Sequence, residues 1–230
     1  MKDQYLTLLT SLPALSCPVA SKEDSNDTQI TLSETQLMLR LTMLDESTHR
    51  ELQQLLKLCP LVRYELKPFD TDHWKQQFEV LIKPEARSLA RWFVELASVL
   101  AAIRIRVASP DHSEPLPLYP GRFGWVIKTH WQDKHFDLDN RFPAIIRWNA
   151  WAKEHQWKLI ERDAVRLAWD YLDRLVLEKP FSFTALAVYW LKWHWVQQWT
   201  ARQAEPLNFE KCLERTLNQV LERDCKEVFQ

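Results

Sequence analysis

Apolar residues recur along most of this chain at the three- and four-residue spacing that is typical of amphipathic helices. The longest pattern begins at Pro84, a residue that a helix tolerates in its first turn, and continues to about Ala108. Its apolar members fill one stripe, and most of the charged residues lie off that stripe. These members are Leu89, Trp92, Phe93, Leu96, Val99, Leu100, Ile103 and Val107. The spacing therefore predicts one long helix that buries a single face.

Shorter patterns predict helices along the rest of the chain. One begins at the capping box of residues 33–36, Ser-Glu-Thr-Gln, in which the serine and glutamine side chains each accept a hydrogen bond from the other residue's backbone amide. Residues 123–131 are compatible with a helix or a short strand, and we favour the helix. Other helices are predicted at residues 1–13, 47–58, 70–82, 142–155 and 159–177, and from Asn208 onward.

The segment from Pro180 to Trp199 is apolar around almost its whole circumference. It carries four tryptophans within ten residues, Trp190, Trp193, Trp195 and Trp199. A surface helix shows an apolar stripe, whereas a helix that is apolar nearly all round is buried or sandwiched. We therefore expect this helix at the centre of the protein, with its rings in the core on one side and on a partner surface on the other.

These patterns predict an all-α protein, a multi-helix bundle with two lobes. The chain of 230 residues contains two glycines, where average usage of roughly 7% would give about sixteen, and few β-branched runs, so helices are favoured over strands. Residues 109–122 contain four prolines and one of the glycines. We expect one all-helical domain over 1–230, with an N-terminal lobe at 1–108, a proline-rich connection at 109–122 and a tryptophan-rich C-terminal lobe at 123–230.

Composition excludes several classes of function. The formal net charge is -1, which gives no bulk electrostatic attraction to nucleic acid. Phosphate-binding loops need glycines that this chain lacks, so no nucleotide or other cofactor is expected. The longest apolar stretch is interrupted by Lys192 and His194, which argues against a membrane span. The four cysteines form no CxxC pair, and we expect free thiols in a reducing cytoplasm.

One cluster of residues could carry chemistry. His130, His135, Asp137 and Asp139 fall within ten residues and could supply the imidazole and carboxylate ligands of a divalent metal. The two histidines are five residues apart, about 140° from one another on a helix, which matches no helical metal motif. The cluster therefore suggests either a polar loop between helices or the metal site of a metal-dependent hydrolase.

Lys192 is unusual because it lies within the tryptophan segment. We expect it at the rim of its helix, since an unpaired buried charge is costly. If its helix is buried on every side, the ammonium needs a carboxylate or an aromatic face. Asp170 and Asp173 lie three residues apart on the preceding helix, where we expect a solvated face rather than a catalytic carboxylate pair.

Several segments resemble an uncharacterised bacterial family encoded in V/A-type ATPase operons, which is itself similar to the d-type central-stalk adaptor of V-type ATPases. The matching segments are YLTLLTSLPAL, WFVELASVLAAIRIR, HFDLD, ERDAVRLAWDYLD and FSFTALAVYWLKWHWVQQW. The chain departs from the family in its high tryptophan content and in Asp163, where a glutamate is usual.

The resemblance implies an all-helical adaptor without chemistry of its own. The d-type adaptors lie on the cytoplasmic face of the membrane rotor ring and bind the foot of the central stalk. By that resemblance, the expected partners are the central-stalk subunits and the rotor ring, and the expected location is cytoplasmic and peripheral at the inner face of the membrane. An assembly factor for the same complex is the alternative within this class, and a metal-dependent hydrolase is the alternative outside it.

For such a role, the end of the long helix and the tryptophan helix are the candidate partner interface. The candidate residues are Arg104, Arg106, Trp190, Lys192, Trp193 and Trp195. No residue is assigned a catalytic role.

Overall fold

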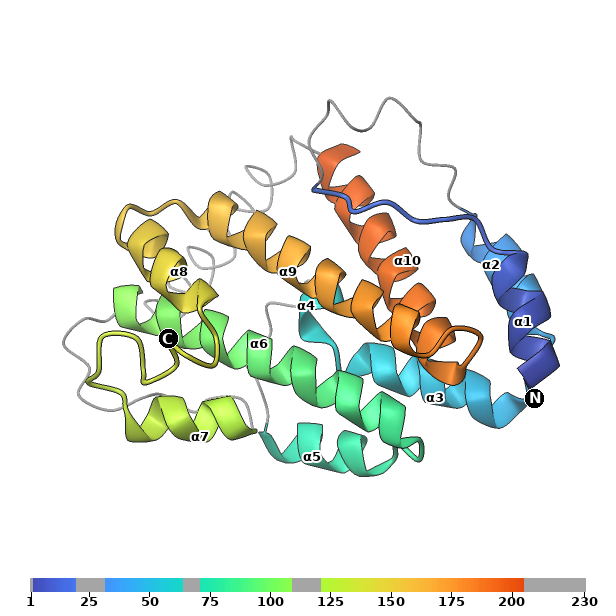
Figure 1. Cartoon of the computed structure of the whole chain (residues 1–230), viewed down its shortest axis with the longest axis horizontal. Helices are drawn as coiled ribbons and strands as arrows, with labels where there is room; N and C mark the ends of the chain where they lie inside the picture. The colour runs from blue at the N-terminus through green and yellow to red at the C-terminus, as the bar shows by residue number, and fades with distance from the viewer. Residues whose placement is uncertain (1, 20–31, 64–70, 109–120, 205–230) are drawn as a thin grey trace, which may run out of the picture.

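The computed structural model describes residues 2–19, 32–63, 71–108 and 121–204, and within these ranges it contains helices and no strand (Figure 1). The helices are α1 (Lys2–Thr10), α2 (Glu34–Leu41), α3 (Glu46–Lys57), α4 (Pro60–Arg63), α5 (Thr71–Glu79), α6 (Pro84–Ala108), α7 (Arg122–Thr129), α8 (Ala144–Lys153), α9 (Trp157–Glu178) and α10 (Phe183–Ala204). The all-α prediction is confirmed.

Local sequence signals set several of these boundaries. The Ser33 side chain accepts a hydrogen bond from the Gln36 amide, and the Gln36 side chain accepts one from the Ser33 amide, so the predicted capping box is present at α2. The longest pattern begins and ends as predicted, at Pro84 and Ala108. Residues 122–129 form helix α7, which decides between the helix and strand alternatives for that segment.

Asp45 caps α3 and makes the stability of this helix dependent on pH. Its carboxylate accepts hydrogen bonds from the Ser47 hydroxyl and from the hydroxyl and amide of Thr48, and these bonds lower its pKa to about 2. A lowered carboxyl pKa adds stability above the ordinary value of 3.8, and this stability is lost as the pH falls toward 2.

Replacing Asp45 with alanine is expected to lower the free energy of unfolding by about 0.5–1 kcal/mol at neutral pH, because the exposed cap loses its acceptor. The difference from wild type should shrink between pH 4 and pH 2, as wild type itself loses the charged acceptor. Urea unfolding across that range measures it. Asp45→Asn keeps a cap oxygen, so a loss equal to that of the alanine variant would contradict the capping role.

Helix α6 runs along the molecule, and the other long helices pack around it (Figure 1). The rings of Trp92 on α6 and Tyr171 on α9 stack with centroids 4.1 Å apart. Helix α10 packs against α9 and also against α3, α4 and α6. Buried residues before and after the proline-rich connection therefore belong to one core.

Some predicted features differ or lie outside the described residues. Helix α5 ends at Glu79, so Ile82 is not part of it and lies exposed in the connection to α6. The buried face of α9 consists of Ile160, Ala164, Val165, Ala168, Trp169 and Leu172. The closing helix predicted from Asn208 and most of the connection at 109–122 lie outside the described residues.

Candidate functional site

The tryptophan helix lies inside the protein. Trp190, Trp193 and Trp195 are buried, and the Trp193 indole donates a hydrogen bond to the Leu32 carbonyl at 3.0 Å. The Trp195 ring meets Phe93 of α6 edge-on, with centroids 5.9 Å apart. Because these rings pack against several neighbouring elements, the central position predicted for this helix is confirmed. In this arrangement the three side chains face other parts of the chain rather than solvent.

Lys192 is buried on the same helix and is paired. Its Nζ lies 2.5 Å from Oδ1 of Asp173 and 4.3 Å from the centroid of the Trp169 ring, both on α9. Burial lowers the pKa of Lys192, and the hydrogen bond with Asp173 acts in the opposite direction. The prediction that Lys192 lies at a rim is therefore wrong. The ammonium is buried because α9 supplies both a carboxylate and an aromatic face.

Of the two arginines predicted at the end of α6, Arg106 is held within the chain. Its guanidinium donates hydrogen bonds to the carbonyls of Asp133 and Lys134, each at 2.9 Å, and to the carbonyl of Trp131. It also stacks on Phe136, with Cζ 3.7 Å from the ring centroid. Arg106 thus fixes the loop between α7 and α8, whereas Arg104 is exposed to solvent.

The predicted metal cluster is divided into separate pairs in the structure. His130 Nδ1 lies 2.8 Å from Asp133, and His135 Nδ1 lies 2.5 Å from Asp139. Asp137 is exposed and has a positive φ of 56°, as does Phe136. Within the described ranges, no three His, Cys, Asp or Glu side chains come together in a way that could hold a metal ion. The segment is a structured loop, which is the other interpretation that its sequence allows.

Solvent-exposed apolar side chains gather at one end of the bundle. Ile82 is 77% exposed, and Val80 precedes it in the connection between α5 and α6. Leu177 is 81% exposed, and Phe181 follows it in the turn between α9 and α10. These two connections lie at the same end of the molecule (Figure 1). We name the set Val80, Ile82, Leu177 and Phe181 the apolar tip.

The segments that carry the apolar tip lie next to one another in the structure. A pocket of about 210 Å³ is lined by the first turns of α6 and by the end of α9, including Pro84, Leu175 and Lys179. The Lys83 ammonium lies 5.0 Å from the centroid of the Phe183 ring at the start of α10. The start of α6 and the turn between α9 and α10 are therefore neighbours in space.

A buried glutamate fixes the Ile82 side of the tip. Oε1 of Glu51, on α3, accepts hydrogen bonds from the backbone amides of Ile82 at 2.9 Å and of Lys83 at 2.7 Å. Glu51 is buried, and its carboxylate satisfies amides that would otherwise be unpaired at the start of α6. Ile82 is therefore presented to solvent by a backbone that is held in place.

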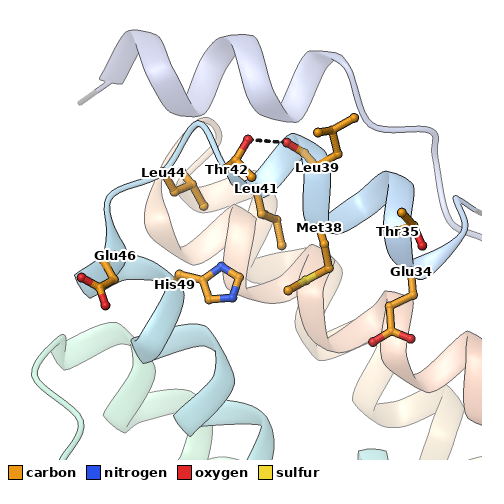
Figure 2. Close-up of a pocket in the computed structure, with 9 residues that line it drawn as sticks. All are labelled: Glu34, Thr35, Met38, Leu39, Leu41, Thr42, Leu44, Glu46 and His49. Carbon is orange, nitrogen blue, oxygen red and sulfur yellow. Dashed lines mark hydrogen bonds between the residues drawn. The ribbon is translucent and has the colours of Figure 1, made fainter.

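A second apolar surface lies along α2. Met38, Leu39, Leu41 and Leu44 line an open groove of about 730 Å³, and Glu34 and Glu46 lie at its two ends (Figure 2). Leu39 is 70% exposed, and the neighbouring Met43 is also exposed. We name this surface the α2 groove. Large exposed apolar areas of this kind mark sites of protein contact more often than isolated exposed residues do.

Neither surface was predicted from the sequence, where an interface was expected among aromatic and basic residues. The sequence feature that could have indicated the α2 groove is Leu39, an apolar residue that lies off the buried stripe formed by Leu37 and Leu41. The sequence feature that could have indicated the apolar tip is Glu51. It is an acidic residue on the buried face of α3, where the other inward residues are mostly leucines, and such a residue needs hydrogen-bond donors from another segment.

The chain has no match among protein-family models, curated proteins or solved structures. None of the helices in the described part of the chain has the length and apolar character that crossing a bilayer requires.

Proposed function

We propose that this protein is a non-catalytic structural adaptor of a bacterial V/A-type rotary ATPase, coupling the central stalk to the membrane rotor ring. The observation that carries the adaptor role is the presence of two separate apolar surfaces, the apolar tip and the α2 groove, on one continuous helical core. An adaptor needs two such surfaces because it must contact two bodies at once.

The structure of the apolar tip suits it to docking. Its Ile82 side is held by the Glu51 carboxylate, so little ordering of the backbone is required when a partner binds. The close-packed helices beneath it, with buried residues from both halves of the chain in one core, would transmit force with little internal movement. These properties fit a mechanical coupler.

The choice of a rotary ATPase is supported by the family resemblance of five segments, which extend from the first helix to α10. In such a complex the protein would be cytoplasmic and peripheral at the inner face of the membrane, held there through the stalk and the rotor ring. The buried tryptophans and Lys192 would then serve the rigidity of the adaptor, and the two apolar surfaces would make the contacts.

Charged substitutions at the two surfaces test the proposal. The double variant Ile82→Asp/Leu177→Asp is expected to lose one group of ATPase subunits from co-purification with the tagged protein, and Leu39→Asp is expected to lose a different group. Burying a charge in an interface weakens binding by about 2 kcal/mol or more, which is roughly thirtyfold. Quantitative mass spectrometry of the proteins that co-purify measures both losses.

Leu159→Asp is the matched control, because Leu159 is an exposed leucine on α9 outside both surfaces. It should retain all of the ATPase subunits. If the tip and groove variants both keep every protein that wild type binds, while all of these variants remain folded, the two surfaces are not the contacts of an adaptor.

A further inference from the structure

A pocket of about 480 Å³ lies between the end of α6, the loop that follows α7 and the outer face of α8. The residues that decide its chemistry are Arg106, Lys134, His135, Ile146, Lys153 and Glu154. Its volume is within the range of sites that bind small molecules. The pocket is separate from the apolar tip and from the α2 groove, since it shares no residue with either.

The charge in this pocket is unbalanced. Arg106, Lys134 and Lys153 carry three positive charges against the one carboxylate of Glu154, which leaves a formal charge of +2 with His135 neutral. Neither Lys134 nor Lys153 forms an ion pair with another residue of the described chain, and both are exposed. Two flexible ammonium groups at the lining of one pocket are available to an anion from outside.

The carboxylates of the neighbouring loop form no ion pair with Lys134 or Lys153 in the described chain, and the Asp133 carboxylate acts electrostatically on Arg106. On the same loop, Asp133 is engaged by His130 and Asp139 is engaged by His135. The partners of Arg106 are the neutral carbonyls of Trp131, Asp133 and Lys134, so its guanidinium is fixed in place and keeps its charge. The fold thus holds one cation rigidly and presents two movable ones beside it.

The apolar side chains that line the pocket indicate that its ligand has an organic part. Ile146 is partly exposed on α8, and Ala150, which also lines the pocket, lies one turn further along the same face. These side chains offer apolar contact to an organic body, and inorganic phosphate alone would leave much of the volume unfilled.

We propose that this pocket binds a small organic polyanion, a phosphate ester or a polycarboxylate in class, through Lys134, Lys153 and Arg106. The two lysines reach its anionic groups, Arg106 supplies a fixed positive potential, and Ile146 and Ala150 contact its organic part. Such a ligand would give an otherwise non-catalytic protein a means of sensing a metabolite. Binding at this pocket would be independent of which proteins contact the apolar tip and the α2 groove.

Isothermal titration with citrate, with glucose 6-phosphate and with inorganic phosphate tests this site. At least one of the two organic anions is expected to bind saturably at one site per chain and more tightly than inorganic phosphate. The double variant Lys134→Gln/Lys153→Gln should weaken that binding by about tenfold or more, since two of the three cations are lost. Arg106 is left unchanged because it holds the loop.

The control is Lys57→Gln/Lys128→Gln, which removes the same charge from two exposed lysines outside the pocket, on α3 and α7. It should bind the organic anion within about twofold of wild type. Equal weakening in both double variants would show general electrostatic attraction and overturn the proposal. Absence of saturable binding of both organic anions up to about 10 mM would also overturn it.

Discussion

Replacing Trp195 with alanine is expected to lower the free energy of unfolding by about 3–5 kcal/mol, one of the two largest effects that the structure predicts. The Trp195 side chain is 2% exposed and meets Phe93 of α6 edge-on. Its helix, α10, packs against α3, α4, α6 and α9, so the cavity left by the indole would be lined by elements that cannot all move inward. Urea unfolding followed by circular dichroism measures the loss.

Trp125 provides a matched control for this prediction. It is the same residue type on α7, but it is 67% exposed. Trp125→Ala should change the free energy of unfolding by less than about 0.5 kcal/mol, because little apolar area returns to water. Similar losses in the two variants would mean that α10 is not the centre of the core.

Replacing Glu51 with alanine is expected to have the second large effect, on both stability and docking. Its carboxylate holds the amides of Ile82 and Lys83. Loss of these charge-assisted hydrogen bonds should lower the free energy of unfolding by about 1.5–3 kcal/mol. The Ile82 side of the apolar tip would also lose its support, so the co-purified proteins that depend on the tip should decrease even at temperatures where the variant is folded.

Glu51→Gln separates the hydrogen bonds from the charge. The amide oxygen of glutamine can still accept from Ile82 and Lys83, so this variant should lose less stability than Glu51→Ala and keep more of the tip-dependent partners. Denaturant unfolding and quantitative co-purification of wild type and the two variants make the comparison. If glutamine and alanine give the same docking and the same stability, Glu51 does not hold the tip through these bonds.

Most of the helices could be predicted because their signals are local. The boundaries of α6 follow from a first-turn proline and an unbroken apolar stripe, and the start of α2 follows from its capping box. Burial of the tryptophan helix could also be predicted, since a helix that is apolar on all sides needs neighbours on all sides.

The features that were missed depend on residues far apart in the sequence. Lys192 is buried because Asp173, 19 positions earlier, meets it from α9. Ile82 is presented to solvent because Glu51, 31 positions earlier, binds its amide. Arg104 is exposed, but Arg106 donates hydrogen bonds to backbone carbonyls of a loop 25 to 28 positions further along the chain. Hydrophobic periodicity shows which face of a helix is apolar. It does not show which polar residues form hydrogen bonds or ion pairs with one another across the fold.

Purification of the active rotary ATPase from the native organism, with each of its proteins quantified, decides whether this chain is an adaptor of that complex. We expect the protein to be present in a fixed ratio to the central-stalk subunits, and Ile82→Asp/Leu177→Asp to lower this ratio while Leu159→Asp does not. Presence in incomplete complexes alone would identify the protein as an assembly factor instead. Absence of the protein from the active complex would contradict the adaptor role.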